Sequence, residues 1–199
     1  PKGWKWAALG EVAQIQGGLQ KQPKRTPKAN HFPFLRVANV HRGRLDLADV
    51  HRIELFAGEL ERLRLQPDDL LIVEGNGSPS QIGRMAVWDG AIADCVHQNH
   101  LIRARPSSAV LARYVAHYWN SPRGVQQVAG VASSTSGLLT LSVAKISSLR
   151  LPIPPLQEQH RIVAALDEHL SAVDAAVAGL ARARANADRL KLAVIEDVY

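Results

Sequence analysis

Three side chains of kinds that bind metals lie close together in the chain: Cys95, His97 and His100. On a strand, alternate side chains share a face, so Cys95 and His97 would point to one side and His100 to the other. The chain contains only one cysteine, so no second cysteine pair exists to complete a structural zinc site. The sequence therefore predicts no metal site, and nothing in it indicates a bound cofactor.

A second pattern with possible chemistry is Pro67-Asp68 followed by Glu74, which resembles the motif of metal-dependent nucleases. The basic residue expected two positions after the glutamate is replaced by Asn76, and Pro67-Asp68-Asp69 is better explained as a turn before a strand. The sequence also lacks an Asn-Pro-Pro-Tyr-like motif of amino-methyltransferases and a Gly-x-x-x-x-Gly-Lys-Ser/Thr phosphate loop. We therefore expect no catalysis by this chain. A methyltransferase or an ATP-driven translocase would have to be another polypeptide.

Positive charge is concentrated in the first three quarters of the chain. Residues 1–150 contain 19 Lys/Arg and 11 Asp/Glu, a net charge of +8, whereas residues 151–199 contain 5 and 7, a net charge of −2. The first 45 residues hold nine basic side chains and a single acid, Glu11. Such a surplus favours a polyanionic partner, because neutralising phosphates releases condensed counterions. The alternative is an ordinary solvated basic face, and charge alone does not indicate sequence specificity.

Residues that could read DNA bases lie in several segments. Specific readout needs planar amides or guanidinium groups that can enter the major groove. In the segment 14–21, two glycines would let the backbone approach DNA and glutamines could pair with adenine, while the cations that follow could hold phosphates. The alternative is a glycine turn on the surface. The candidates from this part of the chain are Gln16, Gly17, Gly18, Gln20, Lys21, Lys24 and Arg25.

Four further segments supply candidates. The segment 74–80 could contact bases or phosphates, or could simply be a turn. Residues 98–100 fall within a predicted strand, where structural hydrogen bonding is favoured over base contact. Segment 133–137 could donate hydroxyls to phosphates or be a mobile loop, and the basic residues around 36–44 could share one DNA face. These candidates are Arg36, Asn39, Arg42, Arg44, Asn76, Ser78, Gln98, Asn99, Ser134 and Thr135.

The elements that would position these residues form an α+β pattern. Alternating or continuous apolar runs predict strands over residues 34–40, 70–73, 84–88 and 96–103, and Asp89-Gly90 favours a tight hairpin turn. Helical spacing predicts a helix over 109–119, ended by Pro122 and Gly124. Strands and helices do not alternate as in a doubly wound sheet. We therefore expect a globular mixed α/β domain over residues 1–150.

The pattern of proline and apolar residues changes after Arg150. Residues 151–155 contain three prolines and predict a stiff extended connector, and residues 156–199 contain no further proline and predict one helix roughly 60–65 Å long. Its apolar residues fall three and four apart with one shortened step near Leu180, which indicates a coiled-coil seam. Such a seam would pair with another copy or another subunit, and the alternative is packing on its own domain. The seam consists of Val163, Leu166, Leu170, Val173, Val177, Leu180, Ala183, Ala187, Leu190, Val194 and Val198.

Several simple features bear on location. No stretch approaches the roughly 18 unbroken apolar residues that a membrane span needs, and the segment from Pro1 to Trp6 lacks the apolar run of a signal peptide. A lone cysteine, Cys95, fits a reducing compartment. We expect a cytoplasmic protein that contacts no membrane. Because residue 1 is not methionine, we expect the chain to be processed or cut from something longer.

Two blocks of sequence resemble the specificity subunit of type I restriction–modification enzymes. The first runs from Leu151 to Val163 with a Pro-Pro-Leu-x-Glu-Gln core, and it is similar to the boundary between that family's target recognition domain and its conserved helix. The second runs from Gly3 to Ala13 and lies where a recognition domain would begin. Together the blocks frame essentially the whole chain.

The resemblance implies a division of labour. Specificity subunits usually carry two recognition domains, each reading half of a bipartite DNA site, and two conserved helices that pair antiparallel and dock methyltransferase subunits. This chain has one domain and one helix, which implies half of a longer subunit or a homodimer. The implied partners are double-stranded DNA, the methyltransferase subunit and, through the complex, the restriction subunit. The alternatives are a DNA nuclease with an unrecognised site, or a coiled-coil assembly protein with incidental basic charge.

Overall fold

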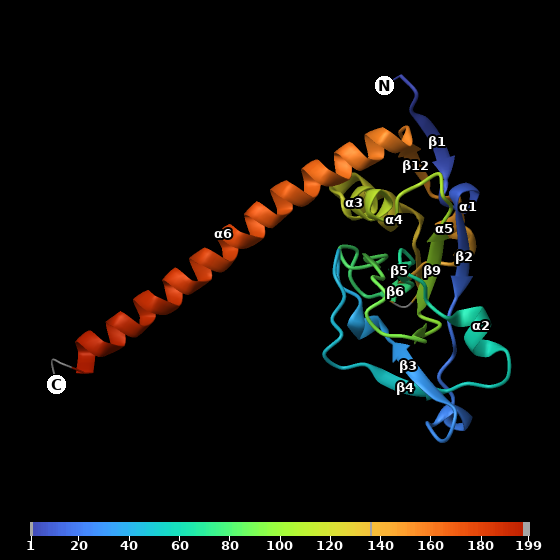
Figure 1. The fold of residues 1–199 in the computed structure, drawn as a ribbon, viewed down its shortest axis with the longest axis horizontal. Coiled ribbons are helices and arrows are strands. Elements are labelled where there is room, and N and C mark those ends of the chain that lie inside the picture. Colours follow the sequence, from blue (N-terminus) through green and yellow to red (C-terminus); the bar gives the residue numbers. More distant parts are fainter. Residues whose placement is uncertain (1, 136, 197–199) are drawn as a thin grey trace. The chain divides into compact units, whose positions relative to one another are not determined.

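The computed structural model describes residues 2–135 and 137–196, and its backbone is drawn in Figure 1. Contacts divide the chain into two compact units, one ending at Gln159 and the other beginning at His160. We call them the globular unit and the helical unit. The globular unit contains every strand of the described chain, while the helical unit is the continuation of one long helix.

The largest sheet contains four antiparallel strands in the order β2 (Ala13–Gly17), β9 (Leu101–Pro106), β5 (Leu70–Val73) and β7 (Met85–Val87). All four residues of β5 are buried, as expected for an inner strand covered on both faces. One apolar cluster packs against this sheet and includes Leu71, Trp88 and Leu101 together with Leu35 and Cys95 from neighbouring segments. This cluster fixes the ends of the strands from which the surface loops leave.

A second sheet has three strands, in the order β4 (His51–Glu54), β3 (His31–Leu35) and β8 (Val96–His97), and β3 pairs with β8 in parallel. A second apolar cluster, which includes Phe34, Ile53 and Val96, lies on this sheet. Within the globular unit, β3 and β4 lie at the end opposite to β1 and β12 (Figure 1).

Two small sheets complete the strand content. One pairs β1 (Lys5–Ala8) with β12 (Arg150–Ile153), and so joins the two ends of the globular unit. The other contains β10 (Ser133–Thr135), β11 (Leu138–Thr140) and β6 (Gly75–Asn76). The sheet of β10, β11 and β6 brings together segments 74–80 and 133–137, which are far apart in the sequence. Both contain residues that the sequence analysis proposes as DNA contacts.

Short helices cover the sheets. They are α1 (Leu9–Val12), α2 (Glu59–Leu63), α3 (Ala112–Asn120), α4 (Pro122–Val131) and α5 (Val143–Ser148), with single 3-10 turns η1 (Pro23–Arg25) and η2 (Val37–Asn39). The predicted helix over 109–119 is confirmed as α3, but Pro122 begins a new helix. Proline suits a first helical position because its missing N–H costs nothing there, and the Ser121 Oγ accepts from the Gly124 N–H at 3.2 Å.

Two strand predictions and one hairpin prediction need correction. The strand expected over 34–40 ends at Leu35 and gives way to η2, and the strand expected over 96–103 is two strands, β8 and β9, with a turn between them. Gly90 does occupy a turn with a φ of 83°, but no hairpin forms there, because β7 pairs with β5 and β8 pairs with β3. Apolar alternation marks buried positions and does not reveal where pairing stops.

The expected connector is a paired strand. Residues 150–153 are extended as predicted, yet they form β12, in which Pro152 lies opposite Trp6 of β1. Proline is tolerated there because a two-stranded sheet leaves each strand with an unpaired side. The Pro152 carbonyl accepts a hydrogen bond from the Tyr114 hydroxyl at 2.6 Å.

The long helix α6 runs from Leu156 to Glu196, as the sequence predicts, and confirms an α+β fold followed by a long C-terminal helix. Its first turn belongs to the globular unit. Gln159 is fully buried; its Oε1 accepts from the Leu111 N–H at 2.8 Å, and its Nε2 donates to the carbonyls of Ala109 and Pro154. The glutamine of the Pro-Pro-Leu-x-Glu-Gln core therefore anchors the start of the helix. Within the described chain, no helix is long and apolar enough to cross a membrane.

Candidate nucleic-acid interface

Backbone hydrogen bonds bring the loop after β2 beside the turn between β8 and β9. The Leu19 N–H donates to the His97 carbonyl at 2.8 Å, and the Asn99 N–H donates to the Leu19 carbonyl at 2.9 Å. Leu19 also forms an isolated parallel bridge with Gln98. Gln20, which is exposed, therefore lies next along the chain to a residue bonded to the 98–100 turn.

The same turn is joined on its other side to the segment that follows β5. The Glu74 N–H donates to the His100 carbonyl at 3.0 Å, and the two side chains meet at 3.1 Å between His100 Nδ1 and Glu74 Oε2. Two residues on, the Asn76 Oδ1 accepts from the Ser78 N–H at 2.9 Å, which closes a local turn. Backbone hydrogen bonds thus place three loops from different parts of the sequence side by side. We call the following set the polar row: Gln20, Gln98, Asn99, His100, Glu74, Asn76 and Ser78.

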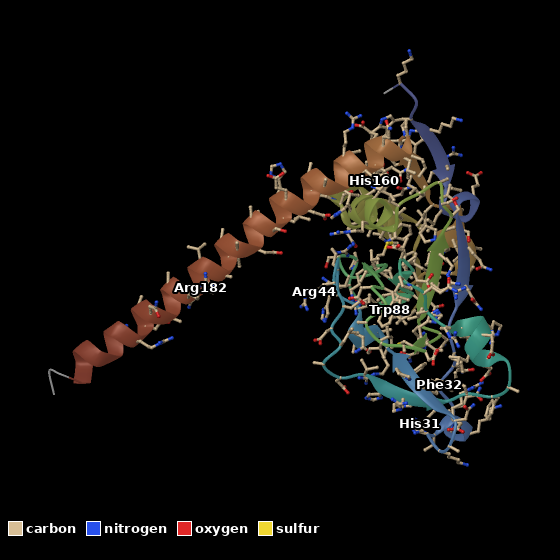
Figure 2. The ribbon with its side chains drawn as sticks, viewed as in Figure 1. His31, Phe32, Arg44, Trp88, His160 and Arg182 are labelled. Carbon is tan, nitrogen blue, oxygen red and sulfur yellow. The ribbon has the colours of Figure 1, made fainter. Side chains whose placement is uncertain are left out.

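Arginine residues border the far end of the polar row. The Arg42 guanidinium donates to the Ser80 carbonyl at 2.6 Å and to the Asn120 Oδ1 at 3.1 Å, and burial, followed by the charge of Arg84, lowers its pKa. Arg42 therefore fastens the 41–44 turn to the 74–80 loop. Arg44 is exposed beyond Gly43, whose φ is 78°, and Figure 2 shows Arg44 at the edge of the globular unit.

Within the polar row, the side-chain amides of Gln98 and Asn99 are the groups best placed to form hydrogen bonds with DNA bases. Both residues are half-buried, and neither side chain makes a hydrogen bond to any residue that the structure describes. They were expected inside a strand, with structural bonding favoured. The turn between β8 and β9 instead leaves only their backbone engaged, since the Gln98 N–H donates to the Leu35 carbonyl and the Asn99 N–H to the Leu19 carbonyl.

Other members of the 16–25 segment are used inside the protein. The Gln16 Oε1 accepts a hydrogen bond from Arg103, which is buried in the sheet. A Cβ added to Gly18 would lie 2.3 Å from the His97 carbonyl oxygen, so this glycine is required by packing against β8. Gly17 has open space around it. A DNA contact by Gln16 or Gly18 stays a prediction, and the geometry gives each a structural role.

The basic residues of this segment differ in how they are held. Arg25 makes a double hydrogen bond to the Glu59 carboxylate at 2.7 and 2.8 Å and lies over the Phe56 ring at 4.7 Å, so its charge is already paired. Lys24 lies 5.7 Å from the same ring with its ammonium exposed, and Lys21 is also exposed. Lys21 and Arg25 line a groove of about 550 Å³ beside β3 and β4. Lys21 and Lys24 are thus the cations of this segment best placed for phosphates.

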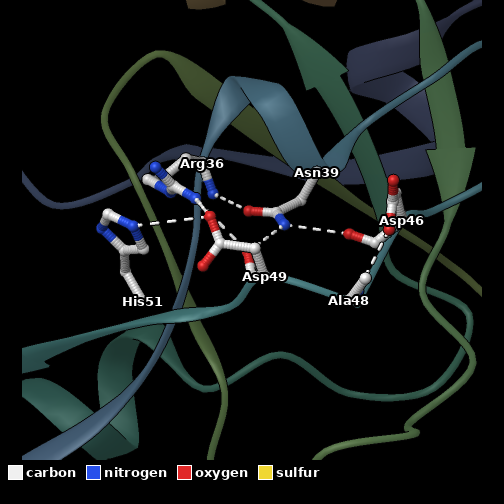
Figure 3. A network of polar contacts seen from close by, with 6 residues as sticks. All are labelled: Arg36, Asn39, Asp46, Ala48, Asp49 and His51. Atoms are coloured by element: carbon white, nitrogen blue, oxygen red, sulfur yellow. Dashed lines mark hydrogen bonds and ion pairs between the residues drawn. The ribbon is translucent and has the colours of Figure 1, made fainter.

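A network of hydrogen bonds around Asn39 gives this residue a structural role, and its contact with DNA stays a prediction (Figure 3). Asn39 is 3% exposed; its Oδ1 accepts from the Arg36 N–H at 2.8 Å, and its Nδ2 donates to the carbonyls of Asp46 and Asp49, each at 2.9 Å. The Arg36 guanidinium pairs with the Asp49 carboxylate at 2.7 Å, and His51 lies 3.7 Å from the same carboxylate. Asn39 supports the 36–49 loop from inside, and Arg36 is partly neutralised.

The β10–β11 hairpin extends the surface on the side of Asn76. Leu139 of β11 lies opposite Asn76 of β6, and Ser134 of β10 lies opposite Leu139. Ser134 is exposed, and the neighbouring Ser133 hydroxyl contacts the Lys145 ammonium. The Thr135 side chain lies outside the described residues. Parts of the two segments predicted separately, residues 75–76 and 133–135, therefore belong to one small sheet.

The apparent catalytic motifs come apart in the structure. Asp68, the first acid of the nuclease-like motif, is exposed in the turn before β5 with a φ of 70°, and Glu74 follows the other end of that strand, roughly 20 Å away along an extended chain. The neighbouring Asp69 is buried in a double hydrogen bond with Arg105. Cys95 is buried, and burial raises its pKa to about 12, whereas His100 is exposed. Among the described residues, no group of three His, Cys, Asp or Glu side chains could hold a metal ion.

His97 is a buried base without a partner. Its side chain is fully inside the protein, and neither ring nitrogen has a hydrogen bond to a described residue. Burial first, and then the charge of Arg103, lower the pKa of His97 to about 3. In the unfolded chain the ring takes up a proton near the ordinary value of about 6.5. Because the unfolded state then binds more protons, the protein loses stability as the pH falls from about 6.5 towards 3.

Replacing His97 by leucine should therefore flatten the acid side of the stability curve. We expect the free energy of unfolding of the wild-type chain to fall between pH 6.5 and pH 4 by up to about 1.4 kcal/mol per pH unit from this group, and the variant to lack that contribution. Urea unfolding at several pH values measures both slopes. Equal slopes for the two proteins would show that His97 is protonated or solvated in the folded state.

The predicted seam of α6 is exposed along the described helix. The exposed fraction of its apolar side chains rises from 37% at Leu166 through 49% at Leu170 to 71% at Leu180. Val173 and Val177 are also exposed, Val163 is half-buried, and Ala183 and Ala187 are exposed. The side chains of Leu190 and Val194, and all of Val198, lie outside the described residues. A stripe of this kind in water favours a partner helix.

A family model and the curated relatives that match this chain all point to the same protein family. The family model for the type I restriction modification DNA specificity domain matches residues 1–176. The chain is 27% identical over 193 residues to the specificity subunit of the type I restriction enzyme EcoKI of Escherichia coli K12, a match that spans 94% of this chain and 40% of that subunit. It is 26% identical over 176 residues to the StySPI specificity subunit of Salmonella potsdam, spanning 86% and 37%. The chain thus spans about two fifths of these relatives.

Solved structures share its fold. A chain from a study of complex assembly and conformational transition of the type I R-M system has a TM-score of 0.71 at 25% identity, covering 96% of this chain and 44% of that chain. The HsdS subunit of Thermoanaerobacter tengcongensis has a TM-score of 0.62 at 25% identity, covering 88% and 39%. These likenesses confirm the α+β fold with its long C-terminal helix.

Proposed function

Because the chain belongs to the type I restriction–modification DNA specificity domain family, we propose that its globular unit reads a short sequence in double-stranded DNA through the polar row. The observation that supports this most directly is the pair of unengaged amides, Gln98 and Asn99, placed between loops that also present Gln20 and Asn76. Planar amides pair with the N6 and N7 atoms of adenine in the major groove. The row therefore has the chemistry needed for base readout.

The cations on both sides of the row would hold the DNA backbone. Lys21 and Lys24 follow Gln20, and Arg44 lies beyond the loop fastened by Arg42. Phosphate contacts fix the position of a protein on the duplex, while contacts to base edges select the sequence. The globular unit carries the surplus of positive charge, which agrees with this arrangement.

We further propose that α6 pairs with a second helix and docks the methyltransferase subunit. The support is the exposed seam from Leu166 to Leu180, which needs a helical partner to leave water. The partner helix would come from a second copy or from the remaining part of a two-domain subunit. In either case each globular unit would read one half of a bipartite site.

On this proposal the chain binds its DNA target without cleaving it. The carboxylates of the nuclease-like motif, Asp68 and Glu74, lie at opposite ends of β5. Incubation of the purified chain with duplex DNA and Mg²⁺ should leave the DNA intact. Cleavage without added subunits would instead favour a nuclease.

Selection from a random duplex library tests the proposed reading. The 199-residue chain, alone and with the methyltransferase of its own system, should enrich one short motif. Enrichment of no motif under either condition would contradict the proposal and would favour a coiled-coil assembly protein whose basic charge is incidental.

Alanine at Lys21, Lys24 and Arg44 should weaken binding to every duplex by a similar factor. Each cation that neutralises one phosphate contributes about 0.9 to the slope of log affinity against log salt, so the triple variant should lose roughly 2 to 3 from that slope. Fluorescence anisotropy at several salt concentrations measures it. The matched control is Arg182, Arg184 and Arg189 of α6 changed to alanine, with the same change of charge. If both triple variants change the slope equally, the proposed phosphate contacts are misplaced.

A further inference from the structure

One acidic side chain lies within the polar row. Glu74 follows the end of β5, where its N–H bonds the His100 carbonyl and its carbonyl accepts from the Leu141 N–H at 2.8 Å. These two bonds fix the backbone on both sides, so the side chain leaves from a rigid position. It is 31% exposed, and its Oε2 contacts the His100 ring at 3.1 Å.

The second carboxylate oxygen of Glu74 is not engaged. Within the described residues, the side chain contacts His100 alone, through Oε2, and no N–H bonds Oε1. Two exposed acids of the globular unit, Asp46 and Asp89, complete local turns by accepting from the N–H groups of Ala48 and Ala91. Glu74 closes no such turn, and a structural role does not account for Oε1.

A carboxylate is also the wrong group for a phosphate. It repels the DNA backbone, so on a surface that otherwise favours a polyanion it weakens binding to every sequence unless it meets a hydrogen-bond donor. The donors on base edges in the major groove are the amino groups of cytosine and adenine, and acidic side chains typically accept from the N4 amino group of cytosine.

We propose that Glu74 is a specificity-determining residue that accepts a hydrogen bond from the cytosine N4 amino group at one position of the DNA target. This inference rests on the proposed DNA reading by the polar row. Thymine at that position presents its O4 acceptor to the carboxylate, and the resulting repulsion excludes it. Glu74 thus discriminates by attraction and by repulsion together, which is how specific interfaces reject near-matches.

His100 is a positioning residue in this arrangement. Its ring, 57% exposed, contacts Oε2 and leaves Oε1 without a hydrogen bond to a described residue. The neighbouring amides of Gln98 and Asn99 come from the same turn, so the base pairs next to the cytosine would be read by the residues beside it.

The test compares Glu74→Gln with the wild-type chain on duplexes that differ at one base pair of the selected motif. We expect the wild-type chain to prefer cytosine over thymine at one position by about ten- to a hundredfold. The glutamine amide can either donate or accept, so the variant should bind both duplexes within about threefold. His100→Ala should reduce the same preference in part, and preferences at the other positions should persist in both variants.

The matched control is Glu61→Gln on α2, which makes the same change of charge at an exposed acid outside the row. It should strengthen or weaken binding equally for both duplexes. If Glu74→Gln enriches the same motif as the wild-type chain, with every preference unchanged, Glu74 does not read a base. If the wild-type chain itself enriches no motif, the proposed DNA reading by the polar row is wrong. That outcome differs from an unchanged motif in the Glu74→Gln variant, which contradicts only the role of Glu74.

Discussion

Replacing Leu166 and Leu170 by glutamate should convert paired chains into single ones. Both residues lie on the exposed seam of α6, and a paired state would bury them against another helix. A buried carboxylate without a partner is strongly disfavoured, and a symmetric pair would hold four of them. We expect the affinity between chains to fall on the order of a thousandfold or more. Light scattering at micromolar concentrations measures the mass directly.

A matched control keeps the added charge and changes the face of the helix. Ala172 and Ala175 are exposed and lie two residues beyond Leu170 and Val173, about half a turn from the seam. Ala172→Glu with Ala175→Glu should leave the pairing intact. A wild-type chain of single mass at these concentrations, both alone and with the methyltransferase, would contradict pairing with a second copy and would leave the remaining part of a two-domain subunit as the source of the partner helix.

Replacing Arg105 by methionine should destabilise the globular unit by about 3–5 kcal/mol. Arg105 bonds both carboxylate oxygens of Asp69 at 2.7 and 2.8 Å, and Asp69 is completely buried. The hydrogen bond to Asp69 raises the pKa of Arg105, against the lowering effect of burial. Removing the cation leaves a buried carboxylate uncompensated where β5 begins. Urea unfolding followed by circular dichroism measures the loss.

The control for this prediction is an ion pair on the protein surface, where solvent screens the two charges. Arg64 and Asp94 lie 3.0 Å apart with both side chains 46% exposed, so Arg64→Met should cost no more than about 1 kcal/mol. If the two variants lose equal stability, the environment of Asp69 is more hydrated than its burial indicates. A large loss for Arg105→Met would show that Asp69, the last residue of the predicted turn Pro67-Asp68-Asp69, has a structural role.

The sequence predicts most reliably the elements whose signal is local. The helix α6 follows from the absence of proline after Pro155 and from its regular apolar spacing, and its predicted extent agrees with the structure from Leu156. The buried strand β5 follows from four consecutive apolar residues. Each of these signals is contained within the segment that it describes.

The interface depends on contacts between distant segments, which the sequence does not display. Asn39 and Gln98 have side chains of similar chemistry, yet Asn39 is buried by the loop that ends at Asp49, whereas Gln98 lies in a turn beside Leu19. The sequence places Glu74 in a nuclease-like pattern and in the candidate segment 74–80, but it does not display the proximity of Glu74 to His100, which arises from the pairing of β5 with β9. Burial and pairing, rather than residue type, decide which polar groups reach the surface.

The ratio of two affinities tests sequence-specific reading most directly. The chain is titrated, at one fixed salt concentration, with the duplex that it selects and with a duplex of the same length and composition in scrambled order. Reading of several base pairs, at about 1–3 kcal/mol each, predicts a ratio of roughly a hundred or more. A ratio near one would mean that the globular unit holds DNA by charge alone, and would contradict the account.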